Sequence, residues 1–338
     1  MVGMKPYTSI AAVCLAILVV ALSGCGPRGG LLIKPVPLDD RLKEATIASD
    51  PGLFVTDKVV IVDVDGLIMN ERGGGWFAPG DNPVSLFVEK LDKAQSDPAV
   101  KALVLRINSP GGGVTASDIM HRRLCEFRTK RKVPVIAVLE DVAASGGYYL
   151  ACGADRIVAH PTSVTGSIGV LVQTISFSGT MKMLGIHAKA VTTGKFKDMA
   201  SPFKPLSDED LAILQGIVDE FYERFLDVVA VGRPGMSVEK VRSLADGRVY
   251  TGSQAVNNGL ADQLGYMDDA IELAKKAGRV GRAKIVMYHR PLGYRANVYS
   301  AVPGPPQQPQ VNVVNVNIPD ALRLAQPQFL YLWTGRTP

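Results

Sequence analysis

The sequence has few of the residues that hold metal ions or build a disulfide framework. Its 338 residues include four cysteines and four histidines, and no two cysteines form a C-x-x-C pair. This spacing argues against a zinc site and against a thioredoxin-like redox motif. A net charge of +5 is small and dispersed, so nothing in the charge indicates a nucleic-acid-binding protein. A hydrophobic content of 47% and a charged content of 20% predict a globular protein with a sizeable core.

The start of the chain also lacks an apolar run of the length that a membrane-spanning helix needs, about 20 residues. The apolar run at residues 10–22 follows Lys5 and is short, which is typical of a signal peptide. It ends in L-S-G-C at residues 22–25, which resembles a bacterial lipobox with cleavage before a lipid-modified Cys25. The alternative is an uncleaved anchor helix. Both interpretations predict attachment to a membrane, with the body of the chain outside the cytoplasm.

Strand-like and helix-like segments alternate through the body of the chain. The predicted strands are residues 59–64, 102–107, 133–139, 156–159, 167–172 and 187–191. The predicted helices are residues 84–95, 115–130, 148–152, 207–231, 238–245, 252–257 and 268–276. Two of these helices are expected to begin with capping boxes, formed by Thr115 with Asp118 and by Ser207 with Asp210. This alternation predicts an α/β fold.

The segments on either side of this body are expected to be connections. Residues 26–50 carry glycine and proline early and charges later, which indicates a tether. Residues 302–311 are rich in proline and glutamine and predict a linker. The apolar patch at residues 329–333 is too short to be a domain, so we expect it to dock on one. Cys125 and Cys152 lie on predicted helices in apolar surroundings, which favours buried free thiols over a disulfide.

The chain is organised around residues 141–155, D-V-A-A-S-G-G-Y-Y-L-A-C-G-A-D. These residues follow the predicted strand 133–139 and contain the apolar helix 148–152, so Ser145 lies where a strand turns into a helix. A hydroxyl in this position lies at a sheet edge near a helix N-terminus. That is the layout of a nucleophile elbow, without the first glycine of G-x-S-x-G. The alternative is that Ser145 only caps the helix.

A second glycine-rich loop, N-S-P-G-G-G, follows the predicted strand 102–107. Parallel neighbouring strands would place this loop and the Ser145 loop at the same edge of the sheet. Backbone amides around Gly111 and Gly112 could then face Ser145, because glycine allows the backbone to approach closely. One amide from each loop would form an oxyanion hole, in which one donor contributes roughly 3–4 kcal/mol to transition-state stabilisation. The alternative is that both loops are only tight turns.

A serine nucleophile needs a base, and no histidine lies in a recognisable catalytic setting. The histidines are His121, His160, His187 and His289. A Ser-His-Asp triad is therefore left open but unsupported, and a lysine is the other option. A lysine acts as a base only when desolvation lowers its pKa from about 10.4 toward about 7–8. The loop G-K-F-K-D-M at residues 194–199 carries two lysines, although its composition alone is typical of a surface loop.

Five motifs follow one another in the body of the chain: INSPGGG, DVAASGGYYLACGAD, VTGSIGV, TTGKFKD and ADGRVYTGSQAVNNGLADQLG. In order and spacing they resemble the signal peptide peptidase A family in its short, single-domain bacterial form, and the terminal PQFLYLW resembles that family's tail. The resemblance implies a serine peptidase with the Clp protease/crotonase-like fold, built from repeated β-β-α units. It divides the chain into four segments: a lipoprotein-type signal peptide (1–24), a tether (25–53), the peptidase domain (54–290) and a linker with a docking tail (291–338).

The resemblance also implies a site built from a Ser-Lys dyad. Ser145 corresponds to the nucleophile, Lys197 to the general base, and Ser167 to the serine that hydrogen-bonds the lysine amine. The implied oxyanion donors are Gly112 and Gly146, with Gly111 as a further candidate, and Lys195 is the solvent-facing neighbour of the base. No metal ion and no organic cofactor are implied.

The partners that the resemblance implies are membrane-associated peptides, notably signal peptide remnants cut at small or apolar residues. The family forms ring-shaped homo-oligomers, in which the lysine can come from a neighbouring subunit. This sequence differs from the family in carrying a lipobox in place of the usual membrane anchor. One alternative is a catalytically silent scaffold of the same fold, which the joint presence of Ser145, Lys197 and Ser167 disfavours. A crotonase-like acyl-CoA enzyme is the other, and the signal peptide disfavours it.

Overall fold

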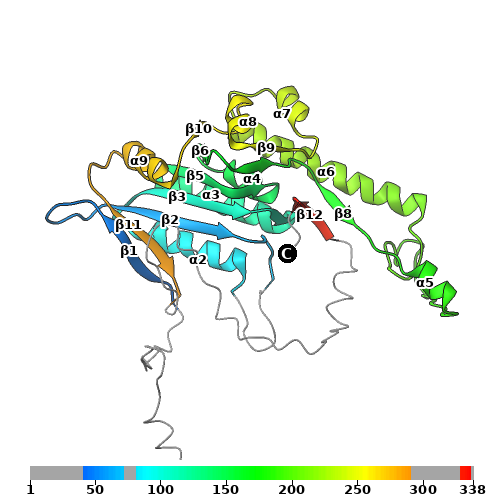
Figure 1. The fold of residues 1–338 in the computed structure, drawn as a ribbon. Helices are drawn as coiled ribbons and strands as arrows, with labels where there is room; N and C mark the ends of the chain where they lie inside the picture. Colours follow the sequence, from blue (N-terminus) through cyan, green and yellow to red (C-terminus); the bar gives the residue numbers. More distant parts are fainter. Residues whose placement is uncertain (1–40, 72–80, 291–327, 336–338) are drawn as a thin grey trace, which may run out of the picture. The chain divides into compact units, whose positions relative to one another are not determined.

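The computed structural model describes residues 41–71, 81–290 and 328–335 (Figure 1). The chain divides into two compact units, residues 1–39 and 40–338, and every described residue belongs to the second. The predicted signal peptide, Cys25 and the predicted linker at 302–311 lie outside the described residues. Within the described ranges, the helices are all too short or too polar to cross a membrane.

A mostly parallel sheet of nine strands forms the centre of the domain, with the order β1-β11-β2-β3-β5-β6-β10, while β7 pairs with β5 and β9 with β7. The strands along this path are β1 (Lys43–Ser49), β2 (Lys58–Asp65), β3 (Val100–Ser109), β5 (Val135–Ala144), β6 (Arg156–Ala159), β10 (Gln263–Leu264) and β11 (Lys284–His289). The branch contains β7 (Val164–Gly166) and β9 (Val249–Thr251). Only the pairs β1·β11 and β7·β9 are antiparallel. The fold is therefore α/β, as predicted.

Helices cover both faces of this sheet (Figure 1). The described helices are α2 (Pro83–Ser96), α3 (Val114–Arg131), α4 (Gly146–Ala151), α5 (Ser178–Met183), α6 (Asp208–Gly232), α7 (Val238–Leu244), α8 (Gly252–Asn257) and α9 (Met267–Ala277), of which α5 projects away from the sheet. On β2 the even-numbered valines from Val60 to Val64 pack with α2, α3 and α4, whereas Val59 and Ile61 pack with α9. This two-sided burial explains why β2 is a continuous apolar run instead of an alternating one.

The chain order agrees with the Clp protease/crotonase-like fold that the resemblance implies. β1, β2 and α2 form one β-β-α unit, and β3, β4 (Gly111–Gly113) and α3 form a second. The third unit departs from this pattern, because α4 follows β5 with only Ser145 between them. The departure places Ser145 directly between a strand and a helix.

A second, three-stranded sheet has the order β4-β12-β8, with β8 at Leu171–Gln173 and β12 at Gln328–Leu332. β12 is antiparallel to both of its neighbours, and Figure 1 shows it in red beside β8. The prediction that the terminal apolar patch docks on the domain is confirmed. Its alternation of large apolar residues, F-L-Y-L-W, is typical of a strand.

The capping box predicted from Thr115 and Asp118 is wrong. α3 begins at Val114 and its N-cap is Gly113, which has no side chain to donate or accept a hydrogen bond. Asp118 instead accepts hydrogen bonds from Tyr149 and Arg224, so tertiary partners have replaced the local one. The capping box of Ser207 and Asp210 at the start of α6 is confirmed.

Two predicted strands also differ from the structure. The predicted strand 167–172 is interrupted, because β7 ends at Gly166 and β8 begins at Leu171. Gly166 and Ser167 have φ values of 82° and 48°, and this left-handed backbone turns the chain out of the sheet. The predicted strand 187–191 is absent, and its residues are exposed. A strand requires a paired neighbour, which this segment lacks among the described residues, and the short helix α5 precedes it instead.

The ordered domain begins earlier than the resemblance indicated, because β1 lies within the stretch expected to be a tether. Both Cys125 and Cys152 are free, as predicted, but only Cys152 is buried and Cys125 is half-buried. Burial raises the pKa of both thiols, that of Cys152 to about 12, which makes each sulfur a poor nucleophile.

Candidate active site

Ser145 has the backbone conformation of a strained turn between β5 and α4. Its φ and ψ are 52° and −116°, a combination that costs a non-glycine residue about 1–3 kcal/mol. Its side chain makes no capping hydrogen bond to α4, and its Oγ has no hydrogen-bond partner among the described residues. The residue is only 1% exposed. The capping alternative is therefore wrong, and the hydroxyl is held in a costly position without a structural partner.

The two glycine loops lie against each other, as predicted. A Cβ atom built on Gly111 would lie 2.7 Å from the backbone nitrogen of Gly146, so only glycine allows this approach. The Gly111 amide donates to Ser109 Oγ, and the Gly111 carbonyl accepts from the Ile68 amide. The Gly113 amide donates to the Ile68 carbonyl. These bonds leave the amide of Gly112 as the one that faces away from Ile68, toward β12.

Ser167 lies beside the nucleophile candidate. The last residue of β5, Ala144, pairs with Gly166 at the end of β7. Ser145 directly follows Ala144 and Ser167 directly follows Gly166, so the two serines leave neighbouring strands at the same level. The Ser145 amide donates to the Gly166 carbonyl at 2.8 Å, and the Ser167 amide donates to the Arg248 carbonyl at 2.8 Å. Ser167 is 7% exposed and is therefore buried next to Ser145.

Lys197 is not brought to this site within one chain. It lies in the exposed loop between α5 and α6, in a segment that Figure 1 shows projecting away from α4. Lys195 in the same loop forms an ion pair with Glu209. The four histidines do not supply a base either, since the Ser145 hydroxyl bonds to none of the described side chains. The structure therefore brings together Ser145, Ser167 and the glycine amides. A base for Ser145 would have to come from another molecule or from another conformation of this chain.

The tail strand β12 lies directly on the glycine loop of β4. Its register pairs Tyr331 with Gly112 and Leu332 with Gly111, and the Trp333 amide donates to the Pro110 carbonyl at 2.9 Å. Hydrogen-bonded pairs alternate along an antiparallel ladder, so the next bonded pair after Pro110 and Trp333 joins Gly112 and Tyr331. A Cβ atom on Gly111 would lie 2.0 Å from the Tyr331 carbonyl oxygen. The amide of Gly112 thus faces a peptide carbonyl in this structure.

The side chain of Tyr331 fills an aromatic pocket that sequence reasoning missed. Its ring stacks on Tyr149 of α4 at 5.1 Å and lies 4.7 Å from the ring of Phe225 on α6. Its hydroxyl donates to the Phe221 carbonyl at 2.8 Å. Tyr149 stands four residues after Ser145, and two of the three pocket residues come from α6, so no local motif could have joined them.

A charged network supports this pocket from behind. The Tyr149 hydroxyl donates to Asp118 Oδ1 at 2.6 Å, and Arg224 of α6 donates to the same oxygen at 2.6 Å. His121 of α3 packs edge-on against Tyr149, with ring centroids 5.2 Å apart. Three helices, α3, α4 and α6, are thereby fixed around one aromatic ring.

His121 should make the fold sensitive to acid. Burial lowers the pKa of His121 from 6.5 to about 4, although Asp118 acts in the opposite direction. The unfolded chain therefore binds the proton more tightly, and stability is lost as the pH falls from about 6.5 toward about 4, by up to roughly 3 kcal/mol. We expect His121→Phe, which keeps an aromatic edge against Tyr149, to flatten the dependence of the melting temperature on pH in this window. Equal slopes for the two proteins would contradict the prediction.

Comparison with known proteins shows that this chain is similar to a family of peptidases. Residues 127–281 match Peptidase family S49. The chain is 38% identical over 231 residues to a putative signal peptide peptidase SppA of Enterococcus faecium, covering 68% of this chain and 67% of that protein. It is 36% identical over 217 residues to a putative protease of Methanocaldococcus jannaschii, covering 64% and 69%. Protease 4 of Haemophilus influenzae is 37% identical over 222 residues, which are 66% of this chain and 35% of that longer protein. Ser145, Ser167 and Lys197 all lie within the matched range.

Proposed function

The chain belongs to peptidase family S49, and from that premise we propose that it is a serine endopeptidase in which the Ser145 hydroxyl attacks the scissile carbonyl. The observation that carries the proposal is the strained Ser145, whose buried Oγ has no hydrogen-bond partner among the described residues. Strain of this kind persists where the surrounding structure imposes it, and it is concentrated at functional sites.

The glycine loops would stabilise the charge that develops during the attack. When Ser145 Oγ bonds to the carbonyl carbon, the carbonyl oxygen becomes an oxyanion that the amides of Gly112 and Gly146 can bind. Each such donor contributes roughly 3–4 kcal/mol to transition-state stabilisation. The proton of the hydroxyl passes to the base and then to the departing amine. Water cleaves the resulting acyl-enzyme and restores Ser145.

We assign the base to Lys197 of a second copy of this chain, with Ser167 as the residue that orients its amine. Large apolar side chains are exposed all along the segment that carries Lys197: Ile175, Phe177, Met183, Leu184, Ile186, Val191, Phe196, Phe203, Leu206, Leu211 and Ile213. Monomeric proteins rarely expose an apolar surface of this extent, whereas interfaces bury it. A homo-oligomer that covers this segment could bring Lys197 to the Ser145 of a neighbour.

The tail strand supports an extended peptide as the substrate. β12 lies between β4 and β8 and pairs with both, which is the way that extended ligands add to exposed strand edges. The pocket of Tyr149 and Phe225 would accept a large apolar side chain next to the reacting carbonyl. Apolar remnants of signal peptides fit this requirement, in line with the activity named for the Enterococcus faecium relative.

Cys25 is proposed as the lipid-modified residue that tethers the domain to the membrane outside the cytoplasm. The support is the order of residues 1–25, in which Lys5, an apolar run and L-S-G-C follow one another.

The peptidase function is tested by incubating the full-length protein with cleaved signal peptides and a fluorogenic apolar peptide, and identifying the products by mass spectrometry. Failure to cleave any of them, with or without the tail, would contradict the proposal.

Removal of the tail should increase activity toward short peptides. A chain that ends before Gln328 loses the strand that engages Gly112 and fills the aromatic pocket. We expect kcat/KM for a short fluorogenic peptide to rise at least about fivefold, because the substrate no longer competes with an intramolecular segment at a millimolar effective concentration. The variant Tyr331→Ser in the full chain should give a smaller rise in the same direction. A fall in activity, in a truncated protein that folds, would show that β12 is part of the active enzyme.

A further inference from the structure

The loop between β1 and β2, two strands that β11 separates in the sheet, ends in an exposed apolar tip. Leu53 and Phe54 are 87% and 94% exposed, and neither side chain belongs to either hydrophobic core. Phe54 has a φ of 62°, a left-handed conformation that is rare for a bulky aromatic residue. The backbone thus bears strain while both apolar side chains face solvent, which is hard to explain by stability alone.

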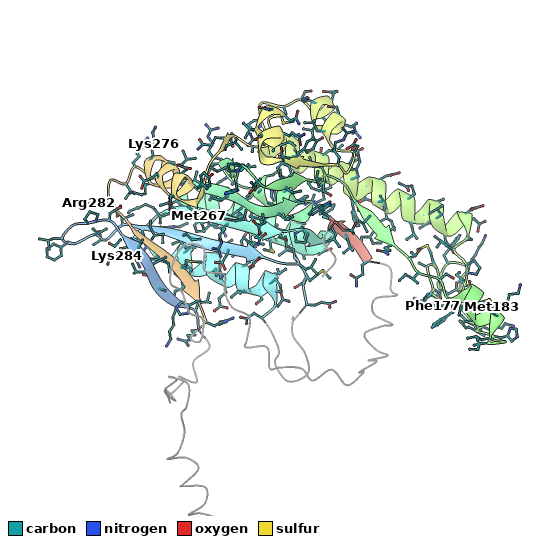
Figure 2. The ribbon with its side chains drawn as sticks, viewed as in Figure 1. Phe177, Met183, Met267, Lys276, Arg282 and Lys284 are labelled. Carbon is teal, nitrogen blue, oxygen red and sulfur yellow. The ribbon has the colours of Figure 1, made fainter. Side chains whose placement is uncertain are left out.

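A cationic turn lies next to this tip. The segment from Lys275 to Lys284 contains five cations and no carboxylate: Lys275, Lys276, Arg279, Arg282 and Lys284. Backbone hydrogen bonds join it to the β1–β2 loop, since the Lys284 amide donates to the Asp57 carbonyl at 2.8 Å and the Asp50 amide donates to the Ala283 carbonyl at 3.1 Å. Figure 2 shows Lys276, Arg282 and Lys284 gathered at this end of the sheet, and Phe177 and Met183 far from it.

Four of these cations form no ion pair within the described ranges, although Arg282 helps to lower the pKa of the nearby Asp50 carboxyl. Lys275 is neutralised by Asp50 and Glu272, each at 2.9 Å. Among the described residues, the side chains of Lys276, Arg279, Arg282 and Lys284 form no ion pair, although Arg123, Arg224 and Arg242 elsewhere on the surface all do. An anionic partner from outside the chain would therefore meet four available charges beside two available apolar side chains.

We propose that this end of the domain docks on an anionic phospholipid surface, with Leu53 and Phe54 inserted among the lipids and the cationic turn at the headgroups. Apolar side chains flanked by lysine and arginine are the combination that binds membrane interfaces. Each basic residue near such a surface strengthens binding roughly fivefold. A second copy of the chain is a poorer occupant of this patch, because a symmetric contact would bring two cationic turns face to face.

The connection of the chain supports the same partner. β1 is the described element that follows the apolar segment at residues 10–22 and Cys25 most closely in the sequence. From Cys25 to Lys43 the chain can span at most roughly 60 Å, so an N-terminal anchor would keep the domain near the bilayer. The docking does not depend on the proposed peptidase function, and it would give a tethered domain a fixed orientation.

Fluorescence quenching by lipids brominated in their acyl chains tests this directly. The full chain carrying Phe54→Trp is reconstituted into vesicles of neutral lipid or of neutral lipid with about one-third anionic lipid, and the signal of the parent chain, with Trp76 and Trp333, is subtracted. Val231→Trp, at a comparably exposed apolar position on α6 and outside the segment that carries Lys197, is the matched control. We expect quenching at position 54 in anionic vesicles to exceed that at position 231 at least about threefold. Replacing Lys276, Arg279 and Arg282 by Gln should abolish the excess.

Equal quenching at positions 54 and 231, or an excess that survives the removal of the charges, would overturn the proposal. So would a blue shift at position 54 that follows protein concentration without lipid, because a second copy would then cover the tip. Amide exchange of the unmodified chain provides an independent reading, since residues 50–57 and 278–284 should be protected by anionic vesicles alone. Cleavage of a soluble peptide should be unaffected in every variant, so a failure of docking is distinguishable from a failure of the peptidase function.

Discussion

Replacing Ser145 by alanine is expected to lower kcat for a fluorogenic apolar peptide by at least about 10⁴-fold, since removal of a nucleophilic serine leaves only the oxyanion amides and substrate binding. The change removes one oxygen atom that bonds to no described group, so the fold should be stable. Alanine keeps the Cβ of serine and therefore the left-handed strain at this position. Turnover and melting temperature, measured together, separate a catalytic effect from an effect on folding.

A serine-reactive fluorophosphonate probe supplies the control. The parent protein should bind one probe molecule per chain, Ser145→Ala should bind none, and the exposed Ser243→Ala variant should react like the parent. Because the tail engages Gly112, labelling should be faster in a chain that ends before Gln328. Undiminished turnover by Ser145→Ala would remove this residue from the mechanism. A parent protein that neither reacts nor cleaves would instead favour the silent scaffold of the same fold.

The sequence predicted the scaffold of the site well because the determining signals there are local. The apolar strand before each glycine loop, the start of the helix after it and the glycines themselves lie within about ten residues of Ser145 or Gly112. What sequence alone left open was whether Ser145 only caps a helix or presents its hydroxyl from a strained turn, as a nucleophile does. That choice depends on one backbone conformation and on the absence of a capping hydrogen bond, which only coordinates can show.

The parts that the sequence did not predict are those that tertiary contacts decide. The residues Thr115 and Asp118 have the spacing of a capping box, but Arg224 and Tyr149 compete for the same carboxylate. Residues 187–191 have the composition of a strand, but no described strand lies beside them to pair with. Tyr331 is 186 positions from Ser145 in the sequence, and its place in the site follows from pairing with β4 and β8.

Lysine replacement should have the second large effect, and mixing experiments should reveal which chain supplies the amine. Lys197→Ala is expected to lower kcat at least about 10³-fold, because a serine hydroxyl without a base is a weak nucleophile. Lys195→Ala, in the same loop and paired with Glu209 instead, is the matched control and should retain activity. Both side chains are exposed in the single chain, so neither change should affect its folding.

The two inactive variants should restore activity when they are assembled together. If Lys197 of one chain serves Ser145 of its neighbour, an equal mixture of Ser145→Ala and Lys197→Ala places both intact groups at about a quarter of the sites. If the lysine serves its own chain, every site in the mixture lacks one group and activity stays at the level of the single variants. The exposed loop that carries Lys197, and its separation from α4 in Figure 1, favour recovery to about a quarter of the parent rate. Unfolding and refolding the mixture before the assay ensures exchange of subunits, and a mixture of Ser145→Ala with Lys195→Ala calibrates the recovery.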